Sequence, residues 1–165
     1  MLNPQQLFAR LDELGLAHNT VEHAPVFTVE QAKAHRGTLP GHHIKNLFLR
    51  NKKEKMWLVV ALEDRAIDLK RLGEMLGAGR LSFGSPERLR KYLGVEPGSV
   101  TPFAVINDSE HKVTLVLDRA LQAEGPINAH PLTNAMTSAI SLADLLRFFE
   151  ATGHSPRWLD FPLSS

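Results

Sequence analysis

The sequence predicts an α+β fold, with a mixed β-sheet flanked by helices in a single domain that spans residues 1–165. The length suits one domain. The apolar share of 43% is enough for a hydrophobic core. Short strand patterns are mixed with helix patterns, without the regular strand–helix rhythm of a parallel α/β protein. No internal repeat or linker divides the chain.

Five helices are predicted from their start and stop signals. Each begins at Asn, Asp, Ser or Thr, whose side chains cap free amides, and all but the second end at a glycine. In the first helix Leu7, Leu11 and Leu14 recur on one helix face. The predicted helices cover residues 4–14, 28–35, 68–76, 86–93 and 142–152.

Strands are predicted where apolar residues alternate or cluster between turn signals. The segments are 19–22, 44–50, 57–62, 80–83, 103–106, 113–117 and 134–140. We expect 44–50 and 57–62 to form a hairpin, and 103–106 and 113–117 to form a second one. The stretches around Pro25, 37–41, 96–102 and 122–131 are expected to be loops.

Composition excludes several classes of protein. There is no cysteine, so disulfides and thiolate chemistry are excluded. No apolar run is long enough to cross a bilayer, and the first 15 residues lack the apolar core of a signal peptide. We therefore expect a cytoplasmic protein without membrane contact.

Charge is distributed unevenly along the chain. Residues 33–91 contain 14 Lys or Arg and 6 Asp or Glu, whereas the remainder contains 5 and 12. This asymmetry is typical of a protein with one side turned to a polyanion, although ordinary solvated helix faces produce the same totals.

The usual catalytic motifs are missing. Eight histidines suggest a metal site, but there is no HExxH, and His42 and His43 would project to opposite faces of a strand. A possible GxGxxG that begins at Gly77 has Ser82 in the last glycine position. There is no P-loop and no GxSxG. We expect neither a metal nor a cofactor.

Three segments together are more specific than any single motif. They are HAPVFT at 23–28, IKNLFL at 44–49 and the GxxxP loop GSVTP at 98–102, with HPLTN following at 130–134. In this order and spacing they resemble the YbaK-like family, which includes the insertion domain of bacterial prolyl-tRNA synthetases and its free-standing relatives. The resemblance runs over nearly the whole chain.

The resemblance implies a function. The family hydrolyses aminoacyl-tRNA esters that synthetases form in error, and the chain is most similar to members that act in trans on alanyl-tRNA(Pro). The implied partner is the acceptor end of tRNA(Pro) carrying alanine, with prolyl-tRNA synthetase as a second candidate. Two alternatives stay open: a deacylase for cysteinyl-tRNA(Pro) or another small aminoacyl-tRNA, and a non-catalytic module that binds tRNA or a synthetase.

The resemblance also implies three catalytic positions. Lys45 lies where the terminal adenosine docks, and it either holds the terminal phosphate, which we favour, or polarises the ester. Gly98 brings backbone amides to the scissile ester, or is only a turn residue. His130 lines the amino-acid pocket or its rim, or acts as acid or base.

Further residues are expected to contact the substrate. The predicted contacts are Phe27, Thr28, Asn46 and Pro102.

We also predict that the charge of residues 33–91 gathers beside the mouth of the pocket.

Overall fold

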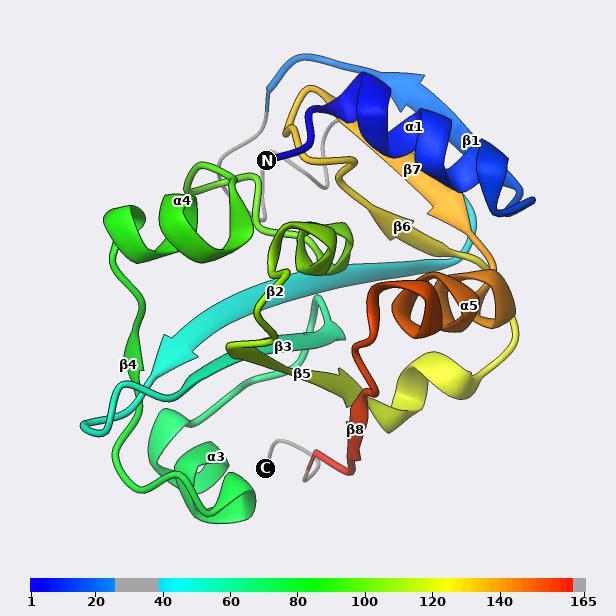
Figure 1. Cartoon of the computed structure of the whole chain (residues 1–165). Coiled ribbons are helices and arrows are strands. Elements are labelled where there is room, and N and C mark those ends of the chain that lie inside the picture. Colours follow the sequence, from blue (N-terminus) through cyan, green and yellow to red (C-terminus); the bar gives the residue numbers. More distant parts are fainter. Residues whose placement is uncertain (26–38, 162–165) are drawn as a thin grey trace.

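A computed structural model of the chain describes residues 1–25 and 39–161 (Figure 1). Within them eight strands form one mixed sheet in the order β1-β7-β6-β2-β3-β5-β8, and β4 also pairs with β2. The predicted α+β class is confirmed. The strands are β1 (His18–Glu22), β2 (His42–Arg50), β3 (Met56–Leu62), β4 (Ser82–Phe83), β5 (Val113–Asp118), β6 (Ile127–Ala129), β7 (Met136–Ile140) and β8 (Arg157–Leu159).

The helices begin at the predicted caps. The Asn3 side chain accepts from the Gln6 amide, and the Gln6 side chain accepts from the Asn3 amide. Asp68, Ser85 and Ser141 cap the other three α-helices. The predicted helix at 28–35 lies outside the described residues. The described helices are α1 (Pro4–Glu13), α3 (Leu69–Leu76), α4 (Pro86–Leu93) and α5 (Leu142–Thr152), with the 3-10 helices η1 (Pro102–Asn107) and η2 (Arg119–Gln122).

The first predicted hairpin is confirmed and the second is wrong. β2 and β3 pair antiparallel, as expected, but 103–106 lies in η1, and β5 pairs parallel with β3. Thr101 caps η1, and Pro102 at its first position has no amide to leave unpaired. A short apolar run that is buried on all sides has no periodicity that separates a strand from a helix.

Two strands were not predicted, because each is very short. β6 and β8 have three residues each, too few for an alternating pattern to stand out. β6 pairs parallel with the start of β2, and β8 pairs parallel with β5.

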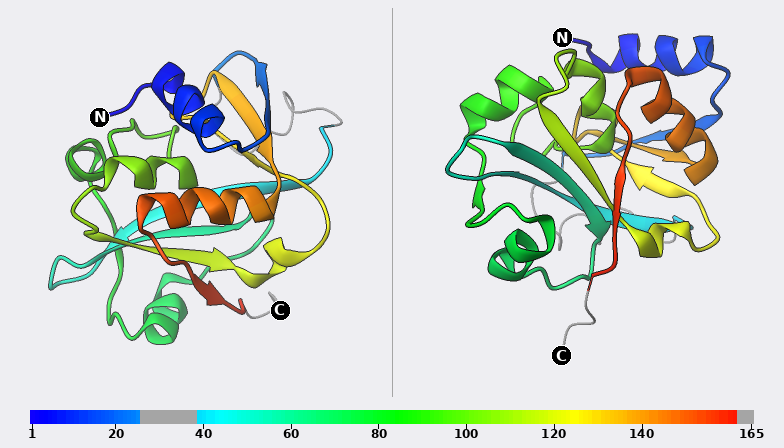
Figure 2. Two further views of the ribbon diagram at one scale, coloured as in Figure 1. Left: turned by 45° about the vertical axis from the view of Figure 1, so that its right-hand side comes forward. Right: turned by 60° about the horizontal axis from the view of Figure 1, so that its bottom comes forward.

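The sheet separates two hydrophobic cores. The larger packs α1, α4, η1 and α5 against one face, and the smaller packs α3 against the other. Figure 2 shows α3 on the opposite side of the sheet from α1, α4 and α5. In the described part of the chain, no helix is both long enough and apolar enough to cross a bilayer.

Candidate functional site

β2 supplies two of the predicted site residues, and it points them in opposite directions. Side chains alternate between the faces of a strand. Phe48 belongs to the larger core and Leu49 to the smaller core beside α3. Asn46 therefore lies on the same face as Phe48, whereas Lys45 lies on the same face as Leu49.

The ammonium group of Lys45 is held in place by a hydrogen bond. It lies opposite the buried Ala61 of β3, and its Nζ donates to the backbone carbonyl of Arg65. Burial lowers the pKa of Lys45 below its usual 10.5, while the carboxylates of Asp64 and Glu63 act in the opposite direction. The site thus contains a partly desolvated cation in a fixed place.

The register between β2 and β6 predicts that His130 lies at the level of Lys45. β2 and β6 are parallel, with His42 opposite Ile127 and His43 opposite Asn128. Continued two residues further, past the end of β6 at Ala129, this register leads to Lys45 and His130. Ile127 and Ala129 belong to the larger core, so the alternation of β6, if continued to the next residue, predicts that His130 points to the other face, as Lys45 does.

Hydrogen bonding fixes the tautomer of His130. Its Nδ1 lies 2.9 Å from the carbonyl oxygen of Met136, which can only accept, so Nδ1 carries the proton. Burial lowers the pKa of His130 below its usual 6.5, the Met136 bond opposes this, and the nearby His23 lowers it further. The ring is therefore neutral at pH 7, and its Nε2 is an acceptor.

His23, which opens the HAPVFT segment, is a further candidate site residue that was not predicted from the sequence. Its ring lies 6.1 Å from the ring of His130, and its Nε2 lies 2.8 Å from the Thr137 hydroxyl of β7. Thr137 also lines a pocket of about 480 Å³ on this face of the sheet. His23, just after β1, therefore lies close to both Thr137 of β7 and His130, just after β6.

Along one edge of β2, the first residues pair with β6 and the last residues pair with β4, and the middle of this edge lies between these two strands. The amide of His42 donates to Pro126 at the β6 end, and the carbonyl of Phe48 accepts from Gly84 at the β4 end. Backbone groups alternate between strand edges, so those of Asn46 face the same edge. The side-chain Oδ1 of Asn46 is buried and has no hydrogen-bond partner among the described residues. A buried acceptor of this kind calls for an explanation, and a ligand is one.

The GxxxP loop begins with a turn. The Ser99 amide donates to the Glu96 carbonyl at 2.9 Å, and Gly98 has φ +90°. With Pro97 before it, Gly98 occupies the position of a type II turn that requires positive φ. The turn by itself explains the glycine. The approach of Gly98 to Lys45 stays a prediction, as does the role of Pro102, which is buried at the start of η1.

The predicted contacts Phe27 and Thr28 lie outside the described residues, and so do Lys33 and Arg36. Among residues 1–25 and 39–161, no group of three His, Asp or Glu side chains is arranged to hold a metal ion.

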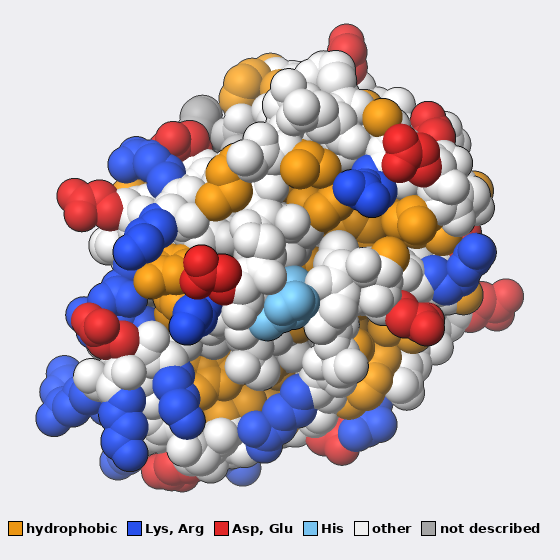
Figure 3. Space-filling model, in the orientation of Figure 1, with side chains coloured by type: hydrophobic (Ala, Val, Ile, Leu, Met, Phe, Trp, Pro, Cys, Tyr) orange, Lys and Arg blue, Asp and Glu red, His pale blue; other side chains and the backbone are white. Residues whose placement is uncertain are grey.

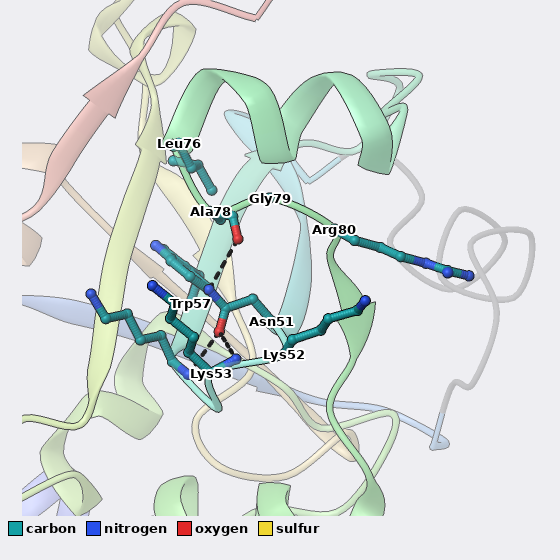
Figure 4. A pocket seen from close by; sticks show the side chains of 10 residues that line it. Asn51, Lys52, Lys53, Trp57, Leu76, Ala78, Gly79 and Arg80 are labelled. Atoms are coloured by element: carbon teal, nitrogen blue, oxygen red, sulfur yellow. Dashed lines mark hydrogen bonds between the residues drawn. The ribbon is translucent and has the colours of Figure 1, made fainter.

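Lysine and arginine side chains gather at one end of β2. In Figure 3 they are concentrated at the lower left, over the turn between β2 and β3 and over α3. A groove of about 430 Å³ at this turn is lined by Lys52, Lys53, Lys55 and Arg80, with no acidic residue in its lining. Figure 4 shows Lys52 and Arg80 extending to the same side. The groove is suited to an anion.

Comparison with known proteins places the chain in a family. A profile of the aminoacyl-tRNA editing domain matches residues 23–148. The chain belongs to the aminoacyl-tRNA editing domain family, as the resemblance in its motifs implied.

Two relatives match over most of their length. The prolyl-tRNA editing protein ProX of Acetoanaerobium sticklandii is 39% identical over 152 residues, which cover 92% of this chain and 93% of that protein. The prolyl-tRNA synthetase associated domain-containing protein 1 of Danio rerio is 43% identical over 153 residues, which cover 92% and 83%.

Solved structures share the fold. A crystal structure described as a candidate trans-editing enzyme for prolyl tRNA synthetase aligns with a TM-score of 0.72 and 21% identity, over 98% of this chain and 100% of that chain. The hypothetical protein APE2540 aligns with a TM-score of 0.71 and 20% identity, over 92% and 97%.

Proposed function

We propose that the chain is a trans-editing hydrolase that removes alanine from alanyl-tRNA(Pro). Membership of the editing family supports ester hydrolysis, and the similarity to a prolyl-tRNA editing protein supports the tRNA. The structural observation that best supports a site is the parallel pairing of β2 with β6, which leads toward Lys45 on one strand and His130 just beyond the other. Action in the cytoplasm, where tRNA is charged, is part of the proposal.

The reaction needs no strong nucleophile. An aminoacyl ester is already activated, and well-oriented groups reach effective molarities of ~10⁵ M or more. Water attacks the ester carbonyl, the acyl–oxygen bond breaks, and alanine and free tRNA leave. The developing oxyanion requires fixed donors, a role that we assign to backbone amides of the GxxxP loop near Gly98.

The side chains then have distinct tasks. Lys45 holds the terminal phosphate as a compact cation. His130 presents Nε2 as an acceptor, which suits the α-ammonium of the amino acid or the attacking water. Asn46, Phe27, Thr28 and Pro102 complete the pocket.

Selectivity follows from size. A synthetase pocket built for proline cannot strongly reject alanine, because a missing methylene contributes only ~1–3 kcal/mol of discrimination. A second pocket that is too small for proline hydrolyses the error product and spares prolyl-tRNA(Pro).

A panel of aminoacyl-tRNAs tests the proposal. We expect the 165-residue chain to deacylate alanyl-tRNA(Pro) fastest under single-turnover conditions. Lys45→Ala should slow this roughly 10- to 100-fold, since a hydrogen bond to a charged group contributes about 1.5–3 kcal/mol. Lys112→Ala, which removes an exposed lysine elsewhere, is the matched control and should leave the rate unchanged.

Other outcomes point to the alternatives. Faster deacylation of cysteinyl-tRNA(Pro) or of another small aminoacyl-tRNA would replace the substrate. Binding of tRNA or of prolyl-tRNA synthetase without any turnover would make the chain a binding module.

A further inference from the structure

The turn that follows β3 is tied to the end of β5 by a buried carboxylate. Asp118 is fully buried. Its Oδ2 accepts from the Leu62 amide at 3.1 Å and from Nε of Arg65 at 2.9 Å. Its Oδ1 accepts from Nη2 of Arg65 at 3.2 Å and from the Ala120 amide at 2.9 Å. Two bonds at each oxygen satisfy the carboxylate, and the guanidinium is held in the two-pronged geometry that arginine prefers.

The same turn contains the carbonyl to which Lys45 is bound. The Arg65 amide closes the turn by donating to the Leu62 carbonyl at 3.0 Å, and the Glu63 amide donates to the His43 carbonyl of β2 at 2.9 Å. The Arg65 carbonyl, which accepts from Nζ of Lys45, therefore lies in a segment that is held by both β2 and β5.

We propose that Arg65 and Asp118 are positioning residues for the editing reaction, because their ion pair fixes the backbone carbonyl that holds the Lys45 ammonium in place. The inference rests on the proposed function, in which Lys45 binds the tRNA. No hydrogen bond or ion pair joins either side chain to Lys45 in the described part of the chain, so both act through the backbone of the turn.

Lys45 needs such a restraint because of the nature of its side chain. A lysine side chain is a point charge on a flexible stem, so an unrestrained ammonium occupies many positions. Positioning is worth most when the group is held before the substrate arrives, and a misplacement of about 1 Å costs up to ~10²-fold in rate.

The test compares single and double variants in single-turnover deacylation of alanyl-tRNA(Pro). Arg65→Ala keeps the backbone carbonyl that accepts from Lys45 but removes the ion pair with Asp118 that fixes it. We expect the rate to fall about tenfold. In a Lys45→Ala background the same change should cost almost nothing further, because residues that act through one another are not additive. Arg119→Ala, which breaks the exposed pair with Asp160, is the matched control and should not change the rate.

Arg65→Ala leaves the buried carboxylate of Asp118 without its cation, and this can destabilise the fold. A second, more conservative variant separates that effect from a loss of positioning. Arg65→Lys keeps a cation for Asp118 but not the two-pronged geometry, and its rate should lie between those of wild type and Arg65→Ala. An equal fall in rate from Arg65→Ala with and without Lys45 would overturn the inference, since it is the result of a general structural defect.

A measurement without tRNA separates this inference from the proposed function. The side-chain NMR signals of Lys45 should differ from those of exposed lysines in the wild type and move toward them in both Arg65 variants. Signals that do not move overturn the positioning role, whatever the deacylation rates. If the signals move but Lys45→Ala keeps full activity, then the proposed role of Lys45 fails, and the positioning role in catalysis fails with it.

Discussion

His130 shows how the surroundings of one residue set its chemistry. Burial disfavours the charged imidazolium and lowers the pKa of His130, as does the neighbouring ring of His23. In the unfolded chain the ring regains its usual pKa near 6.5. The unfolded state therefore binds a proton more readily than the folded state at mildly acid pH. The stability that belongs to neutral His130 is complete above about pH 6.5 and is lost as pH falls through that value toward the lower folded pKa.

Replacement of His130 should accordingly make stability less sensitive to acid. We expect His130→Gln to lose less free energy of unfolding than the wild type between about pH 7.5 and pH 5, because it has no ring to protonate. Urea unfolding at the two pH values measures this difference. An identical loss in both proteins would mean that the pKa of His130 is not lowered.

At the scale of elements, Asn51 joins the turn between β2 and β3 to the loop after α3. Its Nδ2 donates to the carbonyl of Ala78 at 3.0 Å, and its Oδ1 accepts from the amides of Lys53 and Lys55 at 3.1 and 3.0 Å. Figure 4 shows these bonds among the residues that line the groove at this turn. Only 7% of the surface of Asn51 is exposed, so water cannot easily replace these hydrogen bonds when the side chain is removed.

Removal of these bonds should destabilise the fold. We expect Asn51→Ala to cost about 2–3 kcal/mol in the free energy of unfolding, since two amides and one carbonyl are left without their partner. Asn51→Asp keeps the acceptor for both amides but not the donor, and it should cost less. Chemical denaturation of the three proteins gives the ranking. A larger drop in stability for Asn51→Asp than for Asn51→Ala would contradict it.

At the scale of the whole molecule, two groups stand out among the described basic residues of 33–91. Some are paired with carboxylates, as in Arg65–Asp118, Arg88–Glu54 and Arg90–Glu96. Others, including Lys52 and Lys53, line the groove at the turn between β2 and β3. The groove lies about 20 Å from Lys45 along β2, at ~3.4 Å per residue. That the charge of residues 33–91 gathers beside the mouth of the pocket stays a prediction.

The salt dependence of tRNA binding tests whether this groove binds phosphates. Lys52→Ala with Lys53→Ala should weaken binding at low salt and reduce the slope of log K against log salt by about 0.7–0.9 for each phosphate that the groove no longer neutralises. Arg119→Ala with Arg147→Ala removes two exposed arginines outside residues 33–91 and should leave both quantities unchanged. Equal effects in the two double variants would assign the interaction to net charge alone.

The sequence by itself determined the elements whose signals are local. The helix that begins at Asn3 is defined by a cap three residues from its partner and by leucines one turn apart, and the β2–β3 hairpin by two apolar runs around a polar turn. The motifs at 44–49 and 98–102, with HPLTN at 130–134, were also readable in order, which was enough to indicate the family that the profile match shows.

Only the tertiary structure decided which distant residues meet. The parallel pairing of β3 with β5, the parallel pairing of β2 with β6, and the contact of the Asp118 carboxylate with Arg65 all depend on strand register between segments far apart in the chain. A one-residue shift of register would turn each of these side chains to the other face. Register is set by the packing of both cores together, and no local pattern in the sequence contains that information.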